Sequence, residues 1–217
     1  MTKLLPVLLL AAACGGKAAS TTPGNHAGGG GGPVYAALFE QGKTWTFALT
    51  FKTQPPPDIG PPSSGPAGTL TCTVASAHAM GDQQVAKVEC TADGDHTTGD
   101  GYAPAGYWVS TPAGLWHFDG GLAEDELHAK LAALDPKQML IAAAPAARHE
   151  EVGDAENGDG LEVFGARAEG GGWCVDYTFA LGDEAGWELC FGGDGAIASG
   201  SWFEAGATTN ETRYVAK

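Results

Sequence analysis

Acidic side chains cluster in two glycine-rich loops, and such loops can supply the oxygen ligands of a hard cation. Asp93, Asp95 and Asp100 lie in the first loop, and carboxylate oxygens are the ligands that Ca²⁺ prefers. The second loop carries a similar set, Asp154, Glu156 and Asp159. Neither loop has EF-hand spacing, and acidic loops commonly do no more than keep a surface hydrated. Asp93, Asp95 and Asp100 are therefore candidate calcium ligands, with solubilising loops as the alternative.

Two segments come close to known catalytic motifs. The segment from His149 begins like the helix of a zinc protease, but Gly153 stands where the second histidine would bind the metal. The segment Gly42 to Thr44 matches the end of a phosphate-binding loop, but Ala37 replaces the upstream glycine and the segment opens a strand. The six histidines occur singly. We therefore predict no catalytic residues, no enzyme activity, no cofactor and no transition-metal site.

Aromatic residues are the strongest remaining indication of a binding site. Alternation places five of them on apolar strand faces, where they would pack in a core or line a ligand cavity: Trp45, Phe47, Trp173, Tyr177 and Trp187. Three more tryptophans have less clear surroundings and would suit either a cavity wall or stacking on sugar rings: Trp108, Trp116 and Trp202. We predict a cavity that holds an apolar ligand, with a surface that binds a glycan or a protein partner as the alternative.

Two carboxylates are expected to face each other. A turn at Gly182 and Asp183 joins two strands so that Asp176 lies opposite Glu188. Like charges directly across a strand pair are destabilising. Three interpretations follow: both carboxylates point into water, one of them holds its proton, or a cation lies between them.

The cysteines indicate where the protein folds. Four remain when Cys14 is set aside, and an even number suits an oxidising compartment. Four cysteines allow three pairings, and hairpin geometry favours Cys72 with Cys90 and Cys174 with Cys190.

The two expected hairpins differ in the face that carries the disulfide. A turn near Met80 to Asp82 brings Cys72 opposite Cys90 and also Val74 opposite Val88, on the same face. In the second hairpin the cysteines lie on the face opposite the aromatic residues. Each disulfide would stabilise the fold by roughly 3 kcal/mol in the loop-entropy model.

The N-terminus has the pattern of an export signal. Lys3 precedes an apolar stretch, Leu4 to Ala13, that is roughly half the ~20 residues needed to cross a bilayer. Leu10-Ala11-Ala12-Ala13 then runs into Cys14 and two glycines, which resembles the lipobox of bacterial lipoproteins, although that family prefers Leu where this chain has Ala11. The resemblance implies that Cys14 is acylated after residues 1–13 are removed. The alternative is an ordinary signal peptide in which Cys14 has no role.

The rest of the chain divides into a linker and one domain. We expect residues 14–33 to comprise the lipidated N-terminus and a flexible linker that ends in Gly28 to Gly32, and residues 34–217 to form a single antiparallel β domain. Strands are expected at 44–51, 107–111, 114–118, 196–203 and 212–215, with a Pro-rich loop at 54–66.

Helical spacing occurs at one place. Ala123 to Leu134 has three leucines on one face, acidic residues in its first turn and Pro136 beyond its end. Lys137 to Ala144 is expected to continue as a second short helix. The predicted fold class is mainly β, an antiparallel meander forming a twisted sheet or open barrel with one or two short helices.

In outline this arrangement is similar to the open-barrel domains of the bacterial lipoprotein-carrier family, which hold acyl chains in an apolar concavity. The opening Leu38 to Phe47 is also similar to the way many extracytoplasmic bacterial lipoprotein domains enter their first strand. These likenesses imply a fold and a class of ligand, and no functional residue is carried over from them.

The charge balance limits the partners. A net charge of −15 argues against nucleic acid and against docking onto anionic headgroups, which need Lys and Arg. Membrane attachment would then come from the acyl chains on Cys14. We expect an extracytoplasmic lipid-anchored protein, at the outer membrane of a Gram-negative bacterium, that is not an enzyme.

Overall fold

Alternating apolar and polar residues form strands along most of the chain. The computed structural model describes residues 34–93, 104–153 and 160–217, all within the unit Gly31–Lys217. They form one 12-stranded sheet. Its strands are β1 (Thr44–Gln54), β2 (Ser63–Met80), β3 (Gln83–Asp93), β4 (Gly106–Ser110), β5 (Gly114–Phe118), β6 (Ile141–Ala142), β7 (Arg148–Gly153), β8 (Leu161–Glu169), β9 (Gly172–Leu181), β10 (Asp183–Phe191), β11 (Ile197–Ala205) and β12 (Thr209–Ala216).

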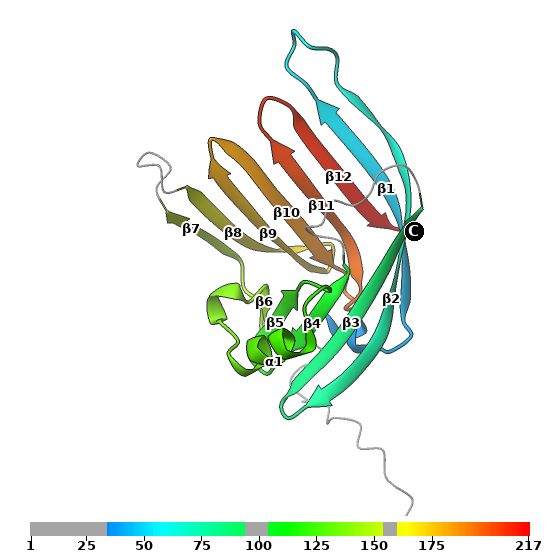
Figure 1. Ribbon diagram of the computed structural model, residues 1–217, viewed down its shortest axis with the longest axis vertical. Coiled ribbons are helices and arrows are strands. Elements are labelled where there is room, and N and C mark those ends of the chain that lie inside the picture. Colours follow the sequence, from blue (N-terminus) through cyan, green and yellow to red (C-terminus); the bar gives the residue numbers. More distant parts are fainter. Residues whose placement is uncertain (1–33, 94–103, 154–159) are drawn as a thin grey trace, which may run out of the picture. The chain divides into compact units, whose positions relative to one another are not determined.

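The sheet is an antiparallel meander in two halves. Its order is β6-β5-β4-β3-β2-β1-β12-β11-β10-β9-β8-β7, so that every pair joins strands consecutive in sequence except the pair of β1 with β12 (Figure 1). That pairing runs from Phe47 opposite Ala216 to Gln54 opposite Thr209. The outermost strands β6 and β7 are not paired with each other in the described part of the chain, and the sheet is open. The predicted fold class is confirmed.

One face of the sheet, the core face, carries the main hydrophobic cluster. The register places Leu49 opposite Tyr214, Gly200 opposite Tyr214 and Leu189 opposite Gly200, so these residues share that face across four strands. The Tyr214 ring lies over Gly200, where a Cβ would collide with its hydroxyl. Burial raises the pKa of the Tyr214 hydroxyl. The opposite face is called the outer face below.

A second cluster lies on the outer face of β3, β4 and β5. Helix α1 (Glu124–Ala132), next to these strands in Figure 1, contributes Leu127 and Leu131 to it. The helix begins where Glu126 Oε2 accepts the N–H of Ala123, and its acidic first turn favours the positive end of the helix dipole. The predicted helix from Ala123 to Leu134 is confirmed, and it covers one face of the sheet.

Both disulfides have the predicted partners. Cys72 is bonded to Cys90 between β2 and β3, and Cys174 to Cys190 between β9 and β10, each with its Cα atoms 4.0 Å apart. The first bond lies on the core face with Val74 and Val88, and the second lies on the outer face. A tight turn closes the first hairpin at Gly81, which has a positive φ of 65°.

Two local predictions were wrong. Lys137 to Ala144 is not a helix: Pro136–Gln138 makes one 3₁₀ turn, and then the N–H of Leu140 bonds to the Leu115 carbonyl, which draws the chain into β6. The Pro-rich loop is shorter than expected, because β2 begins at Ser63. Pro66 is tolerated in a strand because the register of β1 and β2 shifts beside it, at Leu49/Thr50.

The hairpin of β7 and β8 was missed. Its first strand is exposed at every position and shows no alternation. Its second strand contains the apolar pair Val163 and Phe164, and the positive-φ glycines Gly160 and Gly170 bound it. Those turn residues were the available signal.

Removing the Cys72–Cys90 bond should destabilise the domain. We expect a Cys72→Ala, Cys90→Ala double variant to lose about 3 kcal/mol in the free energy of unfolding, because the cross-link restricts the unfolded chain. Urea titration followed by tryptophan fluorescence measures the loss. Non-reducing peptide mapping of the wild type provides the control, and a Cys72–Cys174 link in it would contradict the assigned pairing.

Candidate functional site

A cavity of about 250 Å³ lies where the two ends of the sheet come near each other. One wall comes from β8, β9 and β10, and the other from β4, β5 and the segment that leads into β6. The lining residues are Pro104, Trp108, His117, Lys137, Gln138, Met139, Leu140, Arg148, Phe164, Gly165, Val175, Asp176, Tyr177, Trp187, Glu188 and Leu189. The volume is slightly below the range of about 300–1,000 Å³ that is usual for small-molecule sites.

The wall from β8, β9 and β10 is aromatic. Phe164 is opposite Tyr177, which is opposite Trp187, so the three side chains share the core face. Ring centroids are 4.9 Å apart for Phe164 and Tyr177 and 6.2 Å apart for Tyr177 and Trp187. Trp202 is opposite Trp187 on the next strand and extends the row beyond the cavity. We call these four half-buried side chains the aromatic row.

The floor of the cavity is built around Trp108 and His117, which are opposite each other on β4 and β5. The Trp108 ring lies 4.4 Å from the His117 ring and 6.4 Å from the Phe191 ring of β10. Trp108 Nε1 donates to the Pro104 carbonyl at 2.8 Å. The two halves of the sheet therefore touch through Trp108 and Phe191 beneath the cavity.

His117 is held neutral in this floor. Burial lowers the pKa of its imidazole, and His117 Nε2 lies 2.9 Å from the Ala105 carbonyl, to which a neutral ring donates. The imidazole packs over Gly106, where a Cβ would collide with Nε2. The Nε2 atom is thus used within the protein.

Two cationic side chains line the cavity. Lys137 is exposed in the turn that follows α1, and Arg148 is exposed at the start of β7. The Arg148 guanidinium carbon lies 5.5 Å from the centre of the Phe164 ring, within cation–π range. Its Nε is 3.7 Å from Glu150 Oε2, a long contact between exposed groups.

Two of the five predicted cavity residues line the cavity, and the other three pack in or against the main core. Tyr177 and Trp187 line the cavity, whereas Phe47 is 0% exposed and Trp45 is 7% exposed in the main core. Trp173 is half-buried and packs against the same core. The difference arises because Trp45 and Phe47 lie near the middle of the sheet, where the core face is fully covered.

The three tryptophans whose surroundings were unclear from the sequence also differ in their burial. Trp108 and Trp116 are buried, and Trp116 Nε1 donates to the Asp135 carbonyl at 2.9 Å. Trp202 is half-buried in the aromatic row. They do not form a shared exposed platform.

Sequence reasoning missed the site residues on β7 and β8. Arg148 and Phe164 line the cavity, and they lie on the hairpin for which no strand was predicted. The turn at Gly170 and Gly171 was the local signal that β8 pairs with β9 and so sets Phe164 beside Tyr177.

The facing carboxylates on the outer face have a cation between them. Asp176 and Glu188 are opposite each other as predicted, and the guanidinium of Arg167 on β8 reaches both. Arg167 Nη1 lies 3.0 Å from Asp176 Oδ1, Nη2 contacts Glu188 Oε2, and Nε lies 3.1 Å from Glu169 Oε2. The third interpretation of the carboxylate pair therefore holds, with an arginine of the same chain as the cation.

This outer-face cluster is a structural feature. The hydrogen bond to Glu188 raises the pKa of the Arg167 guanidinium. Three carboxylates occupy the guanidinium edges, so it has little capacity left for a ligand. Gly165 lies under the Asp176 carboxylate, and an added Cβ there would collide with it.

The predicted calcium ligands are only partly described. Asp93 is exposed at the end of β3, while Asp95, Asp100 and the second acidic loop lie outside the described residues. Within residues 34–93, 104–153 and 160–217, no group of three His, Cys, Asp or Glu side chains is placed to hold a metal ion.

Comparisons with known proteins give no family assignment. No protein-family model matches the chain, and no curated protein is significantly similar to it. The chain is therefore described by its structure alone: an open antiparallel sheet with an aromatic cavity between its two ends.

Removing the Arg167 cation should expose the repulsion between Asp176 and Glu188. We expect Arg167→Gln to lower the free energy of unfolding by about 1 kcal/mol, since the group is partly exposed and screened. Adding Glu188→Gln should recover part of the loss, and a double-mutant cycle by urea unfolding measures the coupling. Lys43→Gln, which removes the exposed pair with Glu40, is the control and should cost less than about 0.5 kcal/mol. Equal losses in both variants would contradict the bridging role.

His117 should make stability depend on pH. Its pKa is lower in the folded protein than the ordinary value of about 6.5, so the unfolded chain binds more protons at mildly acidic pH. Stability from the neutral ring is therefore present above about pH 6.5 and is lost as the pH falls. His117→Gln keeps a hydrogen-bond donor and should flatten the fall in melting temperature between about pH 7 and 5.

His128→Gln on the exposed side of α1 is the matched control for this pH series. It should leave the pH profile as in the wild type. A His117→Gln profile that still follows the wild type would show that other groups cause the acid sensitivity.

Proposed function

We propose that this chain is a non-catalytic envelope lipoprotein that holds an apolar molecule in the cavity between the ends of its sheet. The observation that carries the proposal is the aromatic wall: Phe164, Tyr177 and Trp187 stand in register and line one side of the cavity. Aromatic walls around a concave site are typical of small-molecule binding.

The interior of the cavity favours an apolar occupant. Trp108 Nε1 and His117 Nε2 are hydrogen-bonded to backbone carbonyls. A polar group against this floor would lose hydrogen bonds with water and gain none from these two nitrogens, whereas an apolar group gains about 25 cal/mol for each Å² removed from water. This argues for hydrocarbon against the floor and the aromatic wall of the cavity.

The two disulfides indicate an extracytoplasmic location. Among the described residues, none of the helices has both the length and the apolar character required to cross a membrane. For the attachment itself, we propose acyl chains on Cys14, with residues 14–33 as the linker to the domain. The observation behind this part is the lipobox-like segment ending at Cys14.

Ligand binding should depend on the aromatic wall. We expect the fluorescent apolar probe N-phenyl-1-naphthylamine to bind the purified domain, and Trp187→Ala to weaken binding by roughly tenfold, as removal of a large buried contact typically does. Fluorescence titration of the probe measures the affinity.

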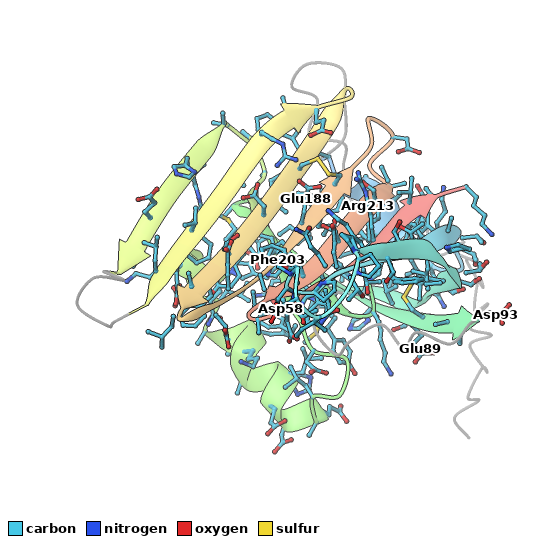
Figure 2. All side chains as sticks on the ribbon, turned by 90° about the horizontal axis from the view of Figure 1, so that it is seen from above. Asp58, Glu89, Asp93, Glu188, Phe203 and Arg213 are labelled. Atoms are coloured by element: carbon cyan, nitrogen blue, oxygen red, sulfur yellow. A yellow bond between two sulfur atoms is a disulfide. The ribbon has the colours of Figure 1, made fainter. Side chains whose placement is uncertain are left out.

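Phe203→Ala is the matched control, because Phe203, labelled in Figure 2, is a half-buried aromatic on the neighbouring strand. Its register opposite Gly186 places it on the outer face. It should leave probe affinity unchanged. Equal weakening by both variants, or no probe binding by the wild type, would contradict the proposed cavity function.

Acylation predicts a specific N-terminal mass. We expect the N-terminal peptide of protein purified from membranes to begin at Cys14 and to carry two or three acyl chains, since a single chain anchors only marginally. Cys14→Ser should move the protein from the membrane to the soluble extracytoplasmic fraction. Mass spectrometry and fractionation provide the measurements, and a bare Cys14 in the membrane-bound protein would contradict the anchor.

A further inference from the structure

We infer that the occupant of the cavity is a single-chain amphiphile with an anionic head, whose head lies against Lys137 and Arg148 and whose chain lies along the aromatic row. This inference rests on the proposed function and adds to it the chemistry and the orientation of the ligand.

The charges at the cavity differ from those of the chain as a whole. The protein has 11 Lys and Arg residues against 26 Asp and Glu residues, yet Lys137 and Arg148 both stand at this one cavity. Asp176 and Glu188 also border it, but Arg167 engages their carboxylates on the outer face. A negative group can therefore meet two cationic side chains at this cavity of an otherwise acidic chain.

Arg148 is held in a position suited to an anion. Its guanidinium lies 5.5 Å from the centre of the Phe164 ring, at the edge of the aromatic wall. Its single ion pair within the described residues is the 3.7 Å contact of Nε with Glu150. The terminal nitrogens keep their donors for the paired oxygens of a carboxylate or phosphate.

Lys137 approaches from the other wall. Its backbone N–H donates to Asp135 Oδ1 at 2.9 Å, and the N–H of Leu140 is bonded to the Leu115 carbonyl at 2.8 Å. These bonds fix the backbone of the turn that presents Lys137. In the described part of the chain its ammonium makes no ion pair, so a ligand head would not have to displace a carboxylate.

The path for the chain is apolar. From Phe164 the aromatic row continues through Tyr177 and Trp187 to Trp202, and all four rings lie on the core face. A cavity of about 250 Å³ holds only part of a long alkyl chain, and the remainder would cover the half-buried Trp202. A charged head at one end and a continuous apolar path at the other match an amphiphile.

The test compares three ligands that share one chain and differ in the head: laurate, lauryl alcohol and dodecyltrimethylammonium. Each is used below its micellar concentration to displace N-phenyl-1-naphthylamine from the purified domain at neutral pH. We expect laurate to bind at least about fivefold more tightly than the alcohol, the order expected of one or two partly exposed charge contacts, and the cation to bind most weakly.

Substitutions of the two cationic residues test where the head of the ligand lies. Arg148→Gln and Lys137→Gln should each reduce the preference for laurate over the alcohol while leaving alcohol affinity nearly unchanged, and Arg148→Lys should retain part of it. Arg213→Gln is the matched control, because Arg213 is an exposed arginine on the outer face (Figure 2). It should leave the preference intact, and a melting curve of each variant confirms that the domain is folded.

The outcomes separate the two proposals. If laurate and the alcohol bind equally, or if the preference survives loss of both cations, the anionic head is wrong and the apolar cavity stands. If none of the three ligands displaces the probe, both are wrong.

Discussion

The pairing of β1 with β12 is the constraint on which the rest of the structure depends. Every other pair in the sheet joins strands that follow each other in sequence, whereas this one joins Phe47 to Ala216 across most of the domain. Without it, the chain would form two separate meanders. The T-shaped contact of Phe47 with Tyr214, with centroids 5.4 Å apart, packs this seam on the core face. Its burial offsets the loop-closure entropy of so long a separation.

The cavity follows from this topology. Because the seam lies in the middle of the sheet, the two halves extend from it in opposite directions, and their core faces meet where Trp108 contacts Phe191. Near the seam this face is filled by large side chains such as Phe47 and Leu49, which are fully buried. Toward β8 the packing is incomplete and leaves Tyr177 and Trp187 half-buried around the cavity. The site is thus the unfilled end of the same apolar layer that stabilises the fold.

The sequence predicted features that depend on near neighbours. The hairpin with Cys72 opposite Cys90 was recognisable because a turn, an alternating pattern and two cysteines agree within one short segment. The opposition of Asp176 and Glu188 followed from the same kind of reasoning. The short helix expected from Lys137 was wrong, because the bond of Leu140 to β5 is a tertiary contact that overrides local preference. Arg148 was missed because the exposed β7 has no alternation to recognise, and Phe164 was missed with the hairpin that β7 forms with β8.

By itself, the sequence predicted most of the strands, favoured the cysteine pairs that form and indicated which face of each disulfide hairpin is apolar, since turns and alternation act over a few residues. The tertiary structure alone decided that the last strand joins the first and that Trp187 borders a cavity while Trp45 is buried in the core. These outcomes depend on contacts between residues far apart in the chain. No local pattern encodes them, because the free energy that selects them comes from burying both halves of the sheet against each other.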